Sequence, residues 1–293
     1  MTYSSFKEII KKNLFDFLGE EYQDWEIKES SVLKINEKME GFTLVAPDQT
    51  EGIAVMPMMY YEVLYNMYKI GIPLEQILKD TAESMVSKDN RNRIANPDIL
   101  KSFDTCKYNI VLEIISKEVN MELLEEYVHR DYLDMAVVYR IIVEDNDDHR
   151  MSTLLTKDIF DSWNIAEEEL YRNAYRNTAE KRGFTLMSLD TMGIISEDTK
   201  PMSLILTNQD MERGAAAMMY PMMLERAARL LEDDFYILPS SLNELFLVAA
   251  EDADSERLKE AVRAANATIV AQQDFLSDSL YFYGRETKEV KIA

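Results

Sequence analysis

A chain of 293 residues, of which 47% are hydrophobic and 29% charged, is long enough to bury one large core or two smaller ones, and its composition argues against a disordered protein. Its 32 basic and 54 acidic residues give a net charge of −22, which argues against direct binding to nucleic-acid backbones or anionic membranes. The single cysteine permits no internal disulfide, the N-terminus lacks the pattern of a signal peptide, and no apolar stretch is long enough to span a membrane, so we expect a cytoplasmic protein.

The first part of the chain predicts helices and a small sheet. Ser5 and Glu8 fit a capping box, and apolar residues recur at helical spacing until Gly19, which predicts an amphipathic helix. Two prolines predict the starts of further helices, one over Met58–Lys69 after Pro57 and one after Pro73. Runs rich in β-branched and aromatic residues predict antiparallel strands at Trp25–Glu29, Phe42–Ala46 and Ile53–Met56.

The middle of the chain predicts a second group of strands and helices. The polar stretches Lys88–Pro97 and Glu144–His149 indicate connections, the second with the composition of a hairpin turn. Strand-like segments lie at Tyr108–Ile115, Ala136–Val143 and Ser152–Thr156. Helical segments lie at Met121–Glu126 and from the capping box Asn164–Glu167 to about Asn177.

The C-terminal part carries the clearest pattern. Asp234–Ala250 predicts two strands joined by the Pro239–Asn243 turn, because two β-branched and aromatic runs flank residues that favour turns. The other predicted elements are strands at Ser203–Thr207 and Ser277–Arg285, and helices at Gly214–Leu231, with a kink or restart at Pro221, and at Asp254–Ala265.

Together these elements predict an α+β fold, with mixed or antiparallel sheets packed against amphipathic helices. We expect two intimately packed halves, residues 1–147 and 148–293, the second of which carries the Leu238–Ser241 turn.

A metal or cofactor site is not expected. The histidines, His129 and His149, do not stand at zinc-ligand spacing with each other or with Cys106. The acidic run Asp145–Asp148 lacks the ligand alternation and the glycine of a calcium loop. The chain also has no phosphate-binding or dinucleotide-binding fingerprint, so we predict no cofactor.

Four residues are candidates for catalysis. Ser240 and Ser241 carry hydroxyls, Glu244 carries a carboxylate, and His129 is a candidate for proton transfer. The structural alternative is that the hydroxyls satisfy backbone donors within the turn, and that a histidine beside an acid is a structural residue.

The candidate binding residues are Pro239 and Asn243 in the turn, and Arg130 and Asp131 beside His129. The acidic clusters, such as Glu167–Glu169 and Glu232–Asp234, favour a solubilising surface. The alternative is a surface that imitates nucleic acid and antagonises a basic protein.

The chain carries an ordered series of motifs: Val128–Tyr139, Trp163–Tyr171 with Asn177-Thr178, Leu206–Asn208 with Gly214-Ala215 and Tyr220-Pro221, Phe235–Ser241, Asn266–Thr268 and Leu276–Tyr281. This series, over nearly the full chain, resembles a family of uncharacterised clostridial proteins with a domain of unknown function (DUF5688-like). The resemblance implies a bacterial cytoplasmic protein and brings no known substrate, cofactor or catalytic residue. Asn243 stands where many relatives have a His directly before the Glu, here Glu244, and Val128 stands where many have Pro. If that His-Glu pair does acid–base or metal chemistry in the relatives, this chain lacks it.

We therefore expect a non-catalytic cytoplasmic protein that binds or regulates another macromolecule, with an unidentified protein as its partner. The alternatives are an acidic nucleic-acid mimic that antagonises a basic protein, and a hydrolase or transferase that uses the Ser240/Ser241 turn with Glu244 and His129.

Overall fold

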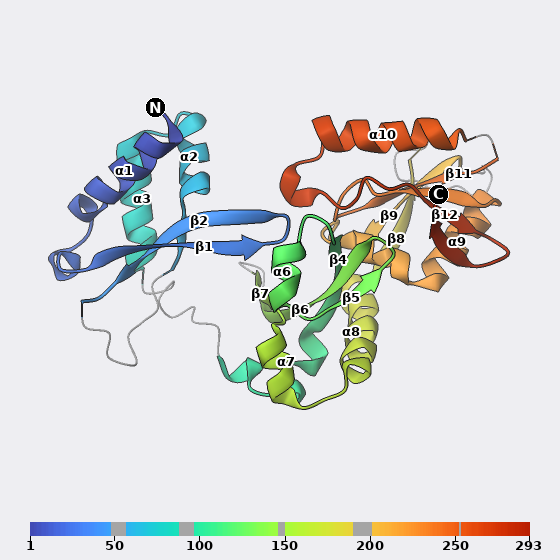
Figure 1. The fold of residues 1–293 in the computed structure, drawn as a ribbon, viewed down its shortest axis with the longest axis horizontal. Helices are drawn as coiled ribbons and strands as arrows, with labels where there is room; N and C mark the ends of the chain where they lie inside the picture. The colour runs from blue at the N-terminus through green and yellow to red at the C-terminus, as the bar shows by residue number, and fades with distance from the viewer. Residues whose placement is uncertain (48–56, 88–96, 146–149, 190–200, 252) are drawn as a thin grey trace. The chain divides into compact units, whose positions relative to one another are not determined.

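The computed structural model describes residues 1–47, 57–87, 97–145, 150–189, 201–251 and 253–293. It divides the chain into two compact units, an N-terminal unit, Met1–Pro97, and a C-terminal unit, Asp98–Ala293. Helices combine with three antiparallel sheets, so the predicted α+β class is confirmed (Figure 1). The predicted strand Ile53–Met56, His149 and nearly all of the predicted connection Lys88–Pro97 lie outside the described residues.

The division between the units follows Pro97, whereas the sequence analysis placed a boundary after residue 147. Strands β6 (Met135–Asp145) and β7 (Arg150–Leu154) pair with each other across that expected boundary. The residues on either side of it therefore belong to one sheet, because hydrogen bonds between neighbouring strands join them.

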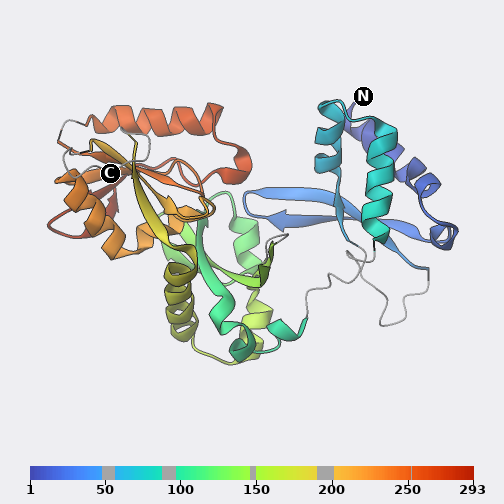
Figure 2. The same ribbon diagram turned by 180° about the vertical axis from the view of Figure 1, so that it is seen from behind.

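The N-terminal unit is a three-stranded sheet with helices on one face (Figures 1 and 2). The strand order is β1-β2-β3, and a two-residue turn containing Asn36 in the left-handed conformation joins β1 to β2. The elements are β1 (Glu26–Lys34), β2 (Glu37–Val45), β3 (Met59–Tyr60), α1 (Tyr3–Asn13), α2 (Tyr61–Lys69), α3 (Leu74–Val86) and the 3-10 helices η1 (Leu14–Phe17) and η2 (Glu20–Tyr22).

The apolar faces of these helices meet the sheet in one core. Its fully buried members include Phe6, Ile10, Phe42, Tyr61 and Ile77. This burial is the main stabilising term of the unit, because apolar side chains leave water when the helices pack on β2.

Two predicted details of this unit are corrected. Thr2 caps α1 in place of Ser5, since Thr2 Oγ1 accepts the Ser5 N–H at 3.2 Å. Helix α2 begins at Tyr61, later than predicted, because Met59 and Tyr60 pair with Phe42 and Gly41 as strand β3. Pairing with a distant strand overrides the local helical pattern after Pro57.

The C-terminal unit contains a four-stranded and a six-stranded sheet. In the first, β6 pairs with β4 (Ile110–Ser116) on one edge and with β5 (His129–Tyr132) and β7 on the other. The second has the order β13-β12-β10-β11-β9-β8. Its strands are β8 (Phe184–Ser188), β9 (Ser203–Asn208), β10 (Phe235–Leu238), β11 (Leu245–Ala249), β12 (Tyr281–Gly284) and β13 (Glu289–Ile292).

Helices cover both sheets, and Figures 1 and 2 show α10 and α9 on opposite sides of the six-stranded sheet. The α-helices are α5 (Phe103–Cys106), α6 (Met121–Glu126), α7 (Lys157–Trp163), α8 (Glu167–Arg182), α9 (Pro221–Leu231) and α10 (Ser255–Thr268). The 3-10 helices are η3 (Pro97–Leu100), η4 (Lys107–Asn109), η5 (Gly214–Met219) and η6 (Gln272–Asp274). No helix in the described ranges has both the length and the apolar character needed to cross a membrane.

The capping box predicted at Asn164–Glu167 is wrong. Asn164 adopts the left-handed conformation, with φ of 52°, and ends α7. Helix α8 begins at Glu167 without a side-chain cap and continues to Arg182. Asn177 and Thr178 of α8 bond the backbone of η4 and β4, which fixes this helix on the four-stranded sheet.

Asp134, in the turn between β5 and β6, joins the two sheets of the C-terminal unit. Its Oδ2 accepts the hydroxyls of Ser277 at 3.0 Å and Ser279 at 2.7 Å, and its Oδ1 accepts the Tyr281 hydroxyl at 2.7 Å. Tyr281 is fully buried, so these bonds lie at the edge of the core. The carboxylate thus holds the start of β12 against the four-stranded sheet.

Cys106, at the end of α5, is fully buried. Its Sγ lies 3.4 Å from the Ser102 carbonyl oxygen. Burial raises the pKa of the thiol to about 11, so the reactive thiolate is scarce at neutral pH.

Candidate functional site

The turn between β10 and β11 contains Ser240, Ser241 and Glu244. Ser240 Oγ donates to Glu244 Oε1 at 3.4 Å. Ser241 Oγ accepts the backbone N–H of Asn243 at 3.0 Å. Ser241 thus satisfies a backbone donor, as the structural alternative predicts, whereas Ser240 bonds the side-chain carboxylate of Glu244 within the same turn.

Asn243 connects this turn to the start of η5. Its Oδ1 accepts the N–H of Arg213 at 3.0 Å, and its carbonyl oxygen accepts the N–H of Gly214 at 3.1 Å. The same carbonyl also accepts the Thr207 hydroxyl at 2.7 Å. Asn243 thus supports a neighbouring backbone segment, which favours a structural role for the turn. Pro239 opens this turn directly after β10.

Gly214 is packed so closely that no side chain fits. A Cβ at this position would lie 2.3 Å from Thr207 Oγ1, 2.5 Å from the Asn243 carbonyl oxygen and 2.8 Å from the Asn208 nitrogen. Two of these three atoms belong to the backbone, so small side-chain adjustments cannot relieve the overlap.

We therefore expect Gly214→Ala to lower the free energy of unfolding by about 1–3 kcal/mol, the usual cost of overpacking. Urea unfolding followed by circular dichroism measures this change. Gly71→Ala is the matched control for steric effects, because no atom lies within 4 Å of a Cβ there, although its φ of 97° adds backbone strain. An unchanged stability for Gly214→Ala would contradict the close packing of η5 on the turn.

His129, Arg130 and Asp131 lie on β5. His129 Nδ1 lies 3.0 Å from the Tyr127 carbonyl oxygen, and Asp131 pairs with Lys117 at 2.7 Å. The hydrogen bond from Lys117 holds the pKa of Asp131 below its ordinary value. Within the described ranges, no hydrogen bond or ion pair joins these residues of β5 to the Pro239–Glu244 turn.

Arg130 anchors β5 to the start of α8. Its Nη2 donates to Glu167 Oε2 at 2.6 Å, its Nε also bonds Glu167, and it pairs with Glu168. The guanidinium lies 4.2 Å from the ring centroid of Tyr171. The hydrogen bonds from Arg130 lower the pKa of Glu167, so the carboxylate stays ionised. This arrangement is that of a structural ion pair at a helix N-terminus.

An ion pair that the sequence analysis missed lies inside the C-terminal unit. Glu113 of β4 is 1% exposed, and its Oε1 accepts from Arg140 Nε of β6 at 2.6 Å. Burial by itself would raise the pKa of Glu113, but the charge and hydrogen bond of Arg140 and the charges of Arg213 and Arg182 hold it below its ordinary value. Glu113 Oε2 and Arg213 Nη1 are buried without a hydrogen-bond partner among the described residues.

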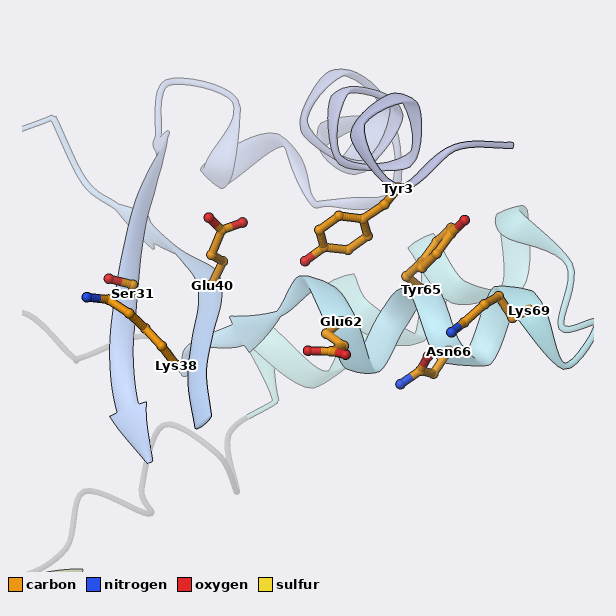
Figure 3. Close-up of a pocket in the computed structure, with 8 residues that line it drawn as sticks. All are labelled: Tyr3, Ser31, Lys38, Glu40, Glu62, Tyr65, Asn66 and Lys69. Atoms are coloured by element: carbon orange, nitrogen blue, oxygen red, sulfur yellow. The ribbon is translucent and has the colours of Figure 1, made fainter. Parts of the chain in front are cut away.

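The N-terminal unit carries a pocket of about 570 Å³. Figure 3 shows it between the start of α1, one face of α2 and the strands β1 and β2. Its lining residues are polar or aromatic: Tyr3, Ser31, Lys38, Glu40, Glu62, Tyr65, Asn66 and Lys69. A pocket of this size is comparable with ordinary small-ligand sites.

Aromatic rings and charges hold the walls of this pocket. The rings of Tyr3 and Tyr65 pack edge to face with centroids 5.2 Å apart. Lys7 pairs with Glu40 at 2.8 Å. Burial raises the pKa of the Tyr3 hydroxyl, and the negative charges of Glu40 and Glu62 raise it further. The hydroxyl is therefore neutral and faces a negative region.

Local sequence patterns do not predict this pocket. Glu62, Asn66 and Lys69 lie on one face of α2 at helical spacing, but a polar helix face is usually just solvated. Tyr3 and Glu40 come from other elements, and only the packing of the unit brings them near α2.

The sequence model of one family, described as a family of unknown function (DUF5688), matches residues 3–285. The chain belongs to this family. The resemblance inferred from the sequence motifs is thereby confirmed over nearly the whole chain. No curated protein and no solved structure matches the chain. The DUF5688 family carries no stated activity, so any function has to be argued from the sites above.

Proposed function

We propose that this protein is a non-catalytic, cytoplasmic binding protein whose partner is another protein. The observation that carries the proposal is the pocket of the N-terminal unit, whose wall combines tyrosine rings with carboxylates and lysines. Tyrosine provides rigid amphipathic contact area at binding sites, and charged groups select the partner.

The arrangement of the candidate catalytic groups supports a binding role over a hydrolase. Ser240 and Ser241 bond within their own turn, whereas an activated serine needs a base that is itself oriented by a third group. Ser31 and Lys38 line the pocket together, but both are exposed, and a lysine base requires a desolvated site.

Labelling with a fluorophosphonate probe tests the non-catalytic part of this proposal. We expect no labelling of the wild type or of the double variant Ser240→Ala/Ser241→Ala, and a stability loss of about 1 kcal/mol in the variant from its missing turn hydrogen bonds. Labelling of the wild type that disappears in the double variant would establish a reactive serine and overturn the proposal.

Affinity capture from a nuclease-treated bacterial lysate tests the binding part. We expect a protein to co-purify in a fixed ratio with the full chain and to be released as the salt concentration rises. A fixed-ratio nucleic acid or small molecule, with no protein, would contradict a protein partner.

A further inference from the structure

The pocket of the N-terminal unit presents several polar groups that nothing in the described chain satisfies. The Tyr3 hydroxyl and the side chains of Glu62 and Asn66 make no hydrogen bond or ion pair with other described residues. Figure 3 shows the Tyr3 hydroxyl directed into the space between Glu40 and Glu62. Two carboxylates and one hydroxyl thus surround the same part of the pocket.

The charges follow a simple order in this pocket. Glu62 and Glu40, the second of which already pairs with Lys7, lie at its centre in Figure 3, and Lys38 and Lys69 lie on either side of them. A bound group with positive charge at the centre and neutral or acidic neighbours matches this order. A bound group with a negative centre and positive neighbours would meet charges of the same sign at the central carboxylates and at the lysine on each side.

The molecule already holds ammonium groups on these walls. Lys7 Nζ lies 5.8 Å from the Tyr3 ring centroid while it pairs with Glu40. Lys69 Nζ lies 5.4 Å from the Tyr65 ring centroid. Tyrosine rings and carboxylates attract cations by their quadrupoles and charges, so the same walls suit a further ammonium group.

We propose that this pocket binds a lysine side chain of the protein partner, and that the residues next to this lysine in the partner are neutral or acidic. This inference rests on the proposed binding function. An ammonium group has three donors around one compact charge, which suits acceptors on separate elements at Tyr3, Glu40 and Glu62. A guanidinium prefers two coplanar acceptors from one carboxylate. The net charge of −22 also favours the approach of a basic protein.

Titration of the full chain with short peptides tests the proposal. The probes are acetyl-Gly-Asp-Lys-Asp-Gly-amide and the same peptide with norleucine in place of lysine, which removes only the ammonium group. Tyrosine NMR resonances report binding, and Tyr3 and Tyr65 are assigned by replacement with phenylalanine. We expect the lysine peptide to shift both resonances and to bind about tenfold more tightly than the norleucine peptide, which is about 1.4 kcal/mol.

The variant Glu62→Gln should weaken binding of the lysine peptide about threefold to tenfold. Glu75→Gln is the matched control, because it removes the same charge from another exposed helical position of the unit, outside the pocket lining. Circular dichroism of both variants verifies that the unit remains folded. If both variants weakened binding of the lysine peptide equally, general charge attraction would explain the effect, and the proposed lysine site would be wrong.

Three other results would overturn the inference. Equal binding of the lysine and norleucine peptides would remove the ammonium group as the recognised feature. Binding of butylamine as tight as that of the lysine peptide would show a site for free amines in place of a protein side chain. A partner protein captured equally by the wild type and by Glu62→Gln would leave the proposed function standing and exclude this pocket as its site.

Discussion

Replacement of Glu113 by alanine should lower the free energy of unfolding by about 3–5 kcal/mol, the usual cost of breaking a buried ion pair. The variant leaves Arg140 largely buried without its carboxylate, and it also leaves the nearby charge of Arg213 uncompensated. Urea unfolding monitored by circular dichroism measures the loss. The matched control is Glu225→Ala, which breaks an exposed pair with Lys288 and should cost about 0–1 kcal/mol.

The same residue should contribute to the acid sensitivity of the protein. The pKa of Glu113 is lower in the folded protein than its ordinary value of 4.5, so its contribution to stability is present above about pH 4.5 and is lost as the pH falls through the folded-state pKa. The stability difference between the wild type and Glu113→Gln should therefore shrink at acid pH. A difference that stays constant from neutral to acid pH would contradict an ionised Glu113.

Replacement of Asp134 by alanine should lower the free energy of unfolding by about 3 kcal/mol, because the hydroxyls of Ser277, Ser279 and Tyr281 lose a charged acceptor near the core. Asp131→Ala is a close control, since Asp131 lies three positions earlier and pairs with Lys117 at the surface. Asp131→Ala should lower the free energy of unfolding by less than about 1 kcal/mol.

The two Asp variants can be compared by urea unfolding under identical conditions. Equal stability losses would mean that Asp134 does not join the two sheets as the hydrogen bonds indicate. The free energy of unfolding of Asp134→Asn should lie between those of Asp134→Ala and the wild type, because the amide keeps one acceptor oxygen and loses the charge.

Local patterns predicted most elements of this fold but not their pairing. The limits of α6, Met121–Glu126, agree with those predicted from the sequence. Asn164 was assigned to the wrong helix because asparagine favours both the N-cap and the left-handed C-terminal position. The strand at Met59-Tyr60 was missed because it depends on pairing with β2, which no local pattern reveals.

One local feature of the sequence indicates the buried ion pair, although it was not used to predict the pair. Glu113 is the only charged residue in the apolar strand Ile110–Ser116, and Arg140 lies within a similar run of β6. Since Glu113 faces Val138, Arg140 is its diagonal neighbour in the paired strands. A lone charge in an apolar strand needs a partner, so the pair could have been inferred once β4 and β6 were paired.

The candidate site was harder to predict for a different reason. Ser240 and Asn243 stand out locally, and the structure uses them to hold a turn and the start of η5. The pocket residues come from α1, β1, β2 and α2, so only tertiary packing assembles them. Whether Arg130 and Asp131 also bind a partner stays a prediction.

The buried position of Cys106 gives experimenters a reporter that needs no engineering. Alkylating reagents attack thiolates, and this sulfur is both enclosed and protonated in the native C-terminal unit. Pulsed alkylation followed by mass spectrometry would therefore count the molecules whose C-terminal unit has opened at any moment. Because the chain has a single cysteine, each modification would report on that unit alone.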